Sequence, residues 1–280
     1  MTPRAAIQKS NLAYIRKAEE LAGSGGGDIR KIVDAWRQRV ILTLVEAGEV
    51  SPLTGDVIKA QISQINEQFK QKLESSLSEN QRRLFVKGIQ LVDKALEAGN
   101  VRTAMPYLSE QKLGFLQRYG AEHIKGLTDS VRTKIATEID LAVLGQKPQQ
   151  DVINAIGKKL GDDASVFGSV QKRAEIIAMT EVNRIQQMST SDRLKQALTQ
   201  VPDLKKQWIH SHVGIPRPGH LLLHLKTIPV DEQFELLGAD GQVYNVDGPY
   251  DPILPVGEVV NCRCKIVPIV GRFEKQSDQS

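Results

Sequence analysis

The chain has few cysteines, few aromatic residues and no long apolar run. Only 2 of its 280 residues are cysteine, which excludes a disulfide framework and makes a reducing compartment the default expectation. Aromatic residues make up 5%, a fraction more typical of long-helix proteins than of β-sandwiches or barrels. No apolar run approaches the length that spans a bilayer, and no hydrophobic signal core follows Met1 to Arg4. Membrane insertion and signal-directed secretion are therefore not expected.

The net charge of +4 is a mild basic bias, but the charges are unevenly placed. From Leu204 to Val230 the chain has bases and no acid, whereas from Asp231 to Val260 it has acids and no base. We favour mutual neutralisation of the two blocks within one folded unit, because single-sign blocks are usually solvated or paired faces. The alternative is a DNA-binding surface, whose phosphate contacts would come from Lys205, Lys206, Arg217 and Lys226.

Apolar residues recur at three- and four-residue steps through most of the first 200 residues, which predicts long helices. The glycine run at 23–27 predicts a flexible joint after the first helix, and Asp28 is the expected cap of the second. Ser51-Pro52 predicts the start of a long helix that ends at Gly99. The helices are expected over residues 4–21, 28–47, 52–98, 122–144, 148–160 and 170–198.

After Pro202 the apolar pattern changes to a period of two residues, which predicts strands over 205–210 and 259–267. The fold class expected is therefore α+β: a long-helical N-terminal region followed by a small mixed domain. The predicted domains are a helical region over 1–165, a mixed α+β domain over 166–270 and a polar tail over 271–280.

An ordered set of short motifs occupies the last part of the chain. Along the sequence these are Arg173-x-x-x-Ile177-Ala178-x-Thr180-Glu181, Lys206-x-Trp208, Arg217-Pro218-x-His220, Phe234 after an acidic pair, Pro249 and Asn261-Cys262-Arg263-Cys264. In this combination the chain resembles the phage head morphogenesis family, which includes the phage Mu F-like proteins and minor head proteins of other tailed phages. The resemblance covers roughly residues 174–268. Met179, where the family often has Arg, and Leu225-Lys226, where it commonly has Gly, depart from the pattern.

The resemblance implies a minor capsid protein that associates with the portal vertex and the capsid interior, in several copies per virion. It implies a role in head morphogenesis, with contact to packaged double-stranded DNA and assembly in the host cytoplasm. Such proteins are not known primarily as enzymes, so no catalytic residue is assigned. The family's C-terminal module has also been compared with the ADP-ribosyltransferase fold, so an enzyme of that kind, or a metal-dependent one, is the alternative.

Both cysteines lie in one tetrapeptide, and four of the five histidines lie between His210 and His224. In a strand, Cys262 and Cys264 would present both sulfurs on one face. With His220, and His210 or His212 as a fourth ligand, they permit a zinc site. Two reduced cysteines packed as small apolar residues are the alternative. A disulfide between them is less favoured, because strand Cα atoms two residues apart are near the limit of a bridge.

For Arg217 and Arg263 the sequence also permits internal pairing with the acidic block. Glu181 is expected to be a carboxylate on a helix surface, since no nucleophile motif or phosphate loop accompanies it. Asn261 and Arg263 are expected to point away from the cysteines by strand alternation.

Overall fold

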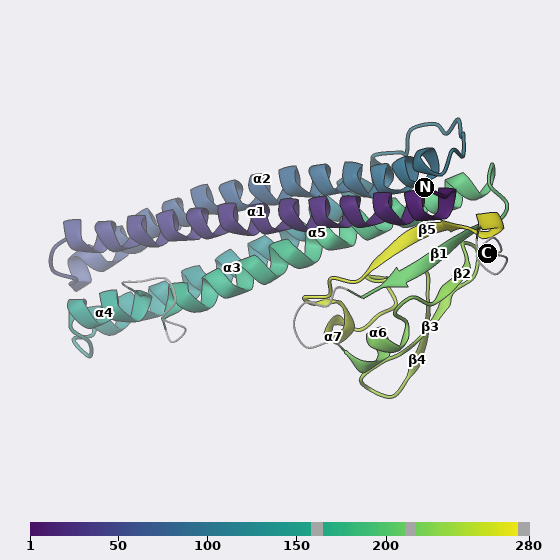
Figure 1. Cartoon of the computed structure of the whole chain (residues 1–280). Coiled ribbons are helices and arrows are strands. Elements are labelled where there is room, and N and C mark those ends of the chain that lie inside the picture. Colours follow the sequence, from purple (N-terminus) through teal and green to yellow (C-terminus); the bar gives the residue numbers. More distant parts are fainter. Residues whose placement is uncertain (158–164, 211–216, 274–280) are drawn as a thin grey trace. The chain divides into compact units, whose positions relative to one another are not determined.

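The computed structural model describes residues 1–157, 165–210 and 217–273. It is an α+β protein with a long-helical N-terminal region and a small C-terminal part of strands and short helices (Figure 1). The helices are α1 (Pro3–Glu46), α2 (Pro52–Ala98), α3 (Gln111–Val143), α4 (Gln149–Ile156) and α5 (Val166–Leu198). The predicted fold class is thus confirmed. In the parts of the chain described here, no helix combines the length and apolarity that a bilayer span requires.

The chain divides into two compact units, each made of segments that are discontinuous in sequence. Unit 1 contains Met1–Gly23, Asn80–Leu116 and Thr180–Ser280, and unit 2 contains Ser24–Glu79 and Gln117–Met179. The predicted domains are contiguous stretches, whereas these units are defined by packing. Each of the four long helices contributes residues to both units.

The prediction of a flexible joint at residues 23–27 is wrong. α1 continues through all the glycines, and Asp28 lies inside it rather than at a cap. Glycine lowers helix stability by about 1 kcal/mol per residue but does not by itself stop a helix. Ala22 and Ile29, on either side of the run, are both buried, and burying such side chains offsets that cost.

The ends of α2 agree with the sequence pattern. At its start the Ser51 backbone N–H donates to Thr54 Oγ1 at 2.9 Å, and Pro52 occupies the first helical position, where no N–H is needed. At its end Asn100 takes a left-handed conformation with φ 57°, and the Val101 N–H donates to the Leu96 carbonyl at 2.9 Å. This is a Schellman closure, which satisfies carbonyls that the helix leaves unpaired.

The core of unit 2 is organised around Trp36, which is fully buried, as the apolar stripe of the sequence predicts. Its ring stacks on Phe69 at 6.2 Å and meets Phe167 edge-on at 5.2 Å. The indole N–H donates to Asn66 Oδ1 at 2.7 Å, so the polar group of this large side chain is also satisfied.

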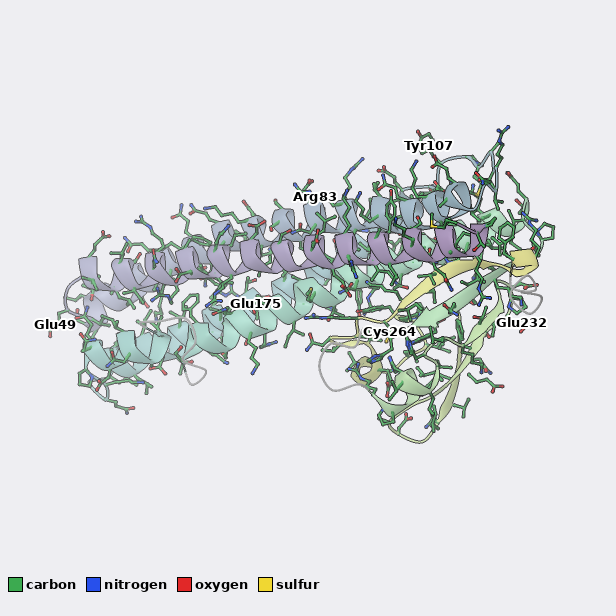
Figure 2. All side chains as sticks on the ribbon, in the orientation of Figure 1. Glu49, Arg83, Tyr107, Glu175, Glu232 and Cys264 are labelled. Carbon is green, nitrogen blue, oxygen red and sulfur yellow. The ribbon has the colours of Figure 1, made fainter. Side chains whose placement is uncertain are left out.

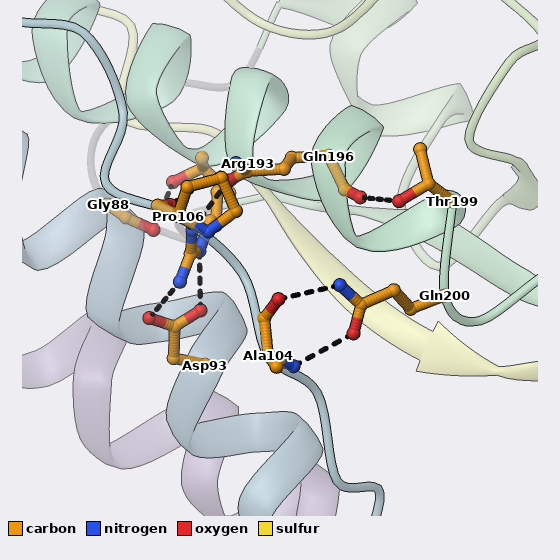
Figure 3. A network of polar contacts seen from close by, with 9 residues as sticks. Gly88, Asp93, Ala104, Pro106, Arg193, Gln196, Thr199 and Gln200 are labelled. Carbon is orange, nitrogen blue, oxygen red and sulfur yellow. Dashed lines mark hydrogen bonds and ion pairs between the residues drawn. The ribbon is translucent and has the colours of Figure 1, made fainter.

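In unit 1 a polar network joins α2 to α5 and to the segment between α2 and α3 (Figure 3). Arg193 donates to both carboxylate oxygens of Asp93, at 2.6 and 2.8 Å, and to the Pro106 carbonyl at 2.8 Å. The Gln200 side chain pairs with the backbone of Ala104 through two hydrogen bonds of 2.8 Å. The bidentate Arg–carboxylate geometry fixes both position and orientation, so this network sets the register of the two helices.

The strands of unit 1 form two antiparallel sheets. β1 (Leu204–Ile209) lies between β2 (Thr227–Pro229) and β5 (Lys265–Val270), and β3 (Phe234–Leu237) pairs with β4 (Val243–Val246). Along the chain, the short helix α6 (Pro218–Leu222) follows β1 and the short helix α7 (Val256–Val259) follows β4. The 3₁₀ turn η1 (Gly271–Phe273) ends the described chain. A Cβ on Gly219 would lie 1.9 Å from the Leu237 carbonyl oxygen, so α6 packs directly on β3.

β5 is an edge strand whose outer polar groups are covered by helices. The Ile266 N–H donates to Gln187 Oε1 at 2.9 Å, and Asn11 Nδ2 donates to the Pro268 carbonyl at 3.0 Å. Lys265 Nζ donates to Asn183 and Gln186 at 2.5 Å each. Because α1 and α5 supply these partners, the edge is closed to pairing with another chain.

The bidentate pair on α5 gives a first testable expectation. Arg193→Lys keeps the charge but loses the planar fork, so we expect the free energy of unfolding to fall by about 1.5–3 kcal/mol. Arg82→Lys is the matched control, because its pair with Glu110 is exposed, and a change within about 0.5 kcal/mol is expected. Urea unfolding of both variants makes the comparison. Equal effects would contradict a special role for the network.

A second expectation concerns the contact of α2 with α5. A Cβ on Gly88 would lie 1.9 Å from Ser189 Oγ and 2.4 Å from the Gln186 carbonyl oxygen. Gly88→Ala should therefore lower the free energy of unfolding by about 1–3 kcal/mol through overpacking. Gly126 on α3 has no atom within 4 Å of the corresponding position, so Gly126→Ala should raise it by about 0.5–1 kcal/mol. Thermal unfolding should give changes of opposite sign in the free energy of unfolding for the two variants. A stabilised Gly88→Ala would show that α2 and α5 are not in close contact.

Candidate metal centre

Three predicted site residues converge inside unit 1. His220 Nδ1 lies 3.6 Å from Cys262 Sγ and 3.5 Å from Cys264 Sγ, and the three ligand atoms all lie within 4.8 Å of one another. All three side chains are buried, and both cysteines are free thiols. Figure 2 labels Cys264 within this part of the chain. Two sulfurs and one imidazole nitrogen form a ligand set that suits zinc.

The strand predicted over 259–267 is wrong in its first half. α7 ends at Val259, a turn follows, and the strand begins only at Lys265. Asn261 is left-handed with φ 56°, and the Cys262 N–H donates to the Val259 carbonyl at 3.0 Å. Cys262 and Cys264 therefore converge through a turn rather than through strand alternation. Burial still alternates, because Asn261 is exposed and Arg263 is half-buried.

Two features favour a turn at Asn261: the backbone preference of asparagine and a hydrogen bond to α5. Asn tolerates the left-handed region better than other residues with a Cβ, and Asn261 takes that position. Its N–H donates to Thr180 Oγ1 on α5 at 3.4 Å, which gives Thr180 a definite structural role. Arg263 has no ion pair with the acidic block among the described residues.

Aromatic rings form one wall of the centre. Trp208 on β1 meets the His220 ring edge-on at 5.6 Å and the Phe234 ring at 5.4 Å. Trp208 and Phe234 are both fully buried. Trp208 thus covers one side of the imidazole, and Phe234 packs behind Trp208.

A polar chain forms the other side. His220 Nε2 lies 2.9 Å from Glu258 Oε2, and Glu258 Oε1 accepts the Ala239 N–H at 2.8 Å. Arg217 Nε lies 3.8 Å from Glu258 Oε2, and Arg217 also donates to the Val260 carbonyl at 2.6 Å. The internal pairing expected for Arg217 is confirmed.

The environment shifts two pKa values at the centre. A hydrogen bond with the Cys264 side chain, aided by His220, holds the pKa of the Cys262 thiol well below its usual range, against the opposing effect of burial. Burial raises the pKa of Tyr250 well above its ordinary value, and negative charge on the two cysteines adds to this effect. The Tyr250 hydroxyl is buried and has no hydrogen-bond partner among the described residues.

His210 and His224 do not join the three converging ligands. The His210 N–H donates to His224 Nδ1 at 3.1 Å, and their rings meet edge-on at 6.4 Å. Among the residues described, His210 is not part of the ligand group, so it is not the fourth ligand that the sequence allowed. His212 lies outside the described residues.

The prediction for Glu181 is wrong. Its side chain is 1% exposed and accepts a hydrogen bond from Arg184 Nε at 3.2 Å. The sequence of α5 places polar side chains around most of the helix, and Asn183, Gln186 and Gln187 are buried as well. Because α5 is covered on several sides, polarity does not mark its exposed face.

The four residues predicted to contact DNA differ in exposure and in their partners. Lys206 is 1% exposed, faces the core beside Leu204 and Trp208, and lies 3.7 Å from Asp247. It therefore belongs to the internal pairing of the basic and acidic blocks and not to a DNA surface. Arg217 is engaged with Glu258, and Lys205 is half-buried. Only Lys226 of the four is exposed.

Sequence reasoning missed two residues of the centre. Glu258 is one of seven acids between Asp231 and Val260, and Tyr250 follows Pro249 in a stretch that carries no further motif. Glu258 has a weak local signal, since it is placed four residues before Cys262. The pairing with His220, 38 residues away, requires the fold.

No protein-family model matches the chain, and no solved structure matches it. An uncharacterized protein of Bacillus subtilis strain 168, YqbB, is 34% identical to it over 103 residues. The match covers 36% of this chain and 32% of YqbB, so the chain aligns with about a third of that relative's length.

Lys206 gives a test of the charge pairing. Burial lowers the pKa of its amine below the usual 10.5, although Asp247 acts against this. Between the lowered pKa and about 10.5 the unfolded chain binds more protons, so the free energy of unfolding should rise with pH there through this residue. Lys206→Met should remove that rise and leave stability at neutral pH unchanged or higher.

Lys226→Met is the control, since this side chain is exposed and should keep the wild-type pH profile. Urea unfolding at several pH values from neutral to alkaline makes the measurement. If the free energy of unfolding depends on pH identically in wild type and Lys206→Met, burial does not lower the pKa of this amine as described.

Proposed function

We propose that this protein is a minor head protein of a tailed bacteriophage that associates with the portal vertex and acts in head morphogenesis and genome packaging. The observation that carries the proposal is the convergence of the motifs behind the resemblance. Thr180, Trp208, His220 and the Asn261–Cys264 segment are far apart in sequence, yet they meet in one packed interior. A set of motifs that forms one structural core supports a family relationship better than any single motif does.

The helical region offers a surface for such a partner. Around the turn between α1 and α2, marked by Glu49 in Figure 2, several large apolar side chains are exposed. They are Leu42, Val45, Leu53, Val57 and Leu144, with exposures of 49%, 57%, 90%, 57% and 68%. A Cβ on Gly55 would lie 2.6 Å from Val143 Cγ2, so the start of α2 and the end of α3 are in contact. Leu42 and Val45 line one surface hollow together, and exposed large apolar side chains of this kind are candidates for an interaction site.

In this proposal unit 2 docks through that apolar surface to the portal protein or the capsid interior. Several copies are carried in the virion, and the packaged double-stranded DNA is a neighbour. The role is non-enzymatic, with the protein made in the host cytoplasm and built into the head during assembly.

The test uses the full chain with an affinity tag, co-produced with the portal and major capsid proteins of the same phage genome. We expect the portal protein to co-purify, and we expect the chain in DNA-filled heads by mass spectrometry. The combined variant Leu42→Asp, Val45→Asp, Leu53→Asp should weaken the association about tenfold or more, equivalent to about 1.4 kcal/mol.

The control is Leu222→Asp with Val256→Asp, two equally exposed apolar positions of unit 1. It should bind like wild type. If only the control loses binding, docking occurs through unit 1 instead. Absence from heads together with no association of the wild-type chain would overturn the head-protein proposal.

A further inference from the structure

We propose that Cys262, Cys264 and His220 bind one thiophilic divalent cation of the zinc class, through both Sγ atoms and Nδ1. In this arrangement Glu258 is the positioning residue for the imidazole. The inference comes from the geometry of these side chains and does not depend on the head-protein proposal.

The distances match a tetrahedral zinc site. Zinc–sulfur bonds of about 2.3 Å and zinc–nitrogen bonds of about 2.0–2.1 Å, at a tetrahedral angle, place nitrogen and sulfur about 3.5–3.6 Å apart. The two Nδ1–Sγ distances are 3.5 and 3.6 Å. Both nitrogen–sulfur separations are therefore those expected for two ligands of one ion, and the three ligand atoms lie within 4.8 Å of one another.

The orientation of His220 leaves one lone pair of Nδ1 directed at the two sulfurs. The Glu258 carboxylate accepts from its other neighbours, so His220 Nε2 donates to it and Nδ1 points at the sulfurs. A neutral imidazole has one lone pair on Nδ1 and can accept well from only one thiol. A cation placed between the three atoms uses that lone pair and both sulfurs at once.

Glu258 completes the ligand geometry from outside. Metal-binding histidines commonly donate their second ring N–H to a carboxylate, which fixes the tautomer and the ring plane. Glu258 is itself held by the Ala239 N–H and by Arg217. The imidazole is thus fixed before any ion arrives.

Three protein ligands leave one position of the tetrahedron, which we assign to a solvent molecule. The buried Tyr250 hydroxyl has no hydrogen-bond partner among the described residues, and its side chain belongs to the same buried cluster as both cysteines. It is the group that can hydrogen-bond such a solvent ligand.

The competing explanation is a nucleophilic cysteine paired with His220 and Glu258. Reactive cysteines are partly exposed, because a substrate must reach the sulfur. Cys262 and Cys264 are each 3% exposed, and the Trp208 ring closes one side of the imidazole. An ion held in the interior fits these side chains better than an attacking thiolate does.

The experiment uses the reduced full chain, stripped with a chelator and titrated anaerobically with cobalt(II). We expect the visible bands of tetrahedral cobalt and the ultraviolet thiolate-to-cobalt band to saturate at about one ion per chain, and zinc to displace the cobalt. Cys262→Ser with Cys264→Ser, and separately His220→Gln, should lose these signals. Glu258→Gln should keep the stoichiometry and weaken the affinity about 10–100-fold.

His224→Gln is the matched control, because it removes a nearby histidine outside the ligand group, and it should bind like wild type. The double cysteine variant is replaced by a second measurement if it does not fold: the rate at which a thiol reagent modifies the wild-type cysteines is measured with and without zinc. Zinc should slow that reaction at least tenfold. A folded, reduced wild type without tetrahedral cobalt bands or zinc protection would overturn the proposal. So would bands that persist in the double cysteine variant.

Discussion

The interior of the mixed part of the chain depends on one buried contact, between His220 Nε2 and Glu258 Oε2 at 2.9 Å. It joins α6 to α7, two short helices that have too few residues to be stable alone. It also turns Nδ1 toward Cys262 and Cys264. A buried carboxylate without this partner and its neighbour Arg217 would carry a large desolvation cost, so the surrounding segments are fixed by the need to keep it paired.

α5 plays the corresponding role for the rest of unit 1. Three of its buried polar residues hold other segments: Thr180 holds the turn at Asn261, Gln187 covers the edge of β5, and Arg193 fixes α2. Polar contacts of this kind are directional and require one arrangement, whereas apolar packing tolerates several. α5 therefore supports the segments around the candidate metal centre, and it is not an amphipathic helix with a single polar, solvent-exposed face.

Apolar periodicity predicted most of the long helices, and the Ser51-Pro52 and Gly99-Asn100 signals located both ends of α2. The predicted start of the third long helix at residue 122 is wrong, because α3 begins at Gln111. The same reasoning failed at residues 23–27, because a local preference for flexibility was weaker than the burial of neighbouring side chains. It failed at Glu181 because a helix covered on several sides has no exposed face for polarity to mark. The meeting of His220, Cys262 and Cys264 was predicted, but for a strand that is a turn in the structure.

The sequence by itself determined the fold class, the helical period, the change to strands after Pro202, and which residue types were rare enough to mark a site. Those properties depend on interactions between residues close in the chain. Only the tertiary structure decided that Glu258 pairs with His220, that Tyr250 belongs to the same buried cluster as the cysteines, and that Lys206 is buried beside Asp247. Each of these depends on contacts across roughly tens of residues, and no local pattern encodes which acid, among seven of the same type, will reach the interior.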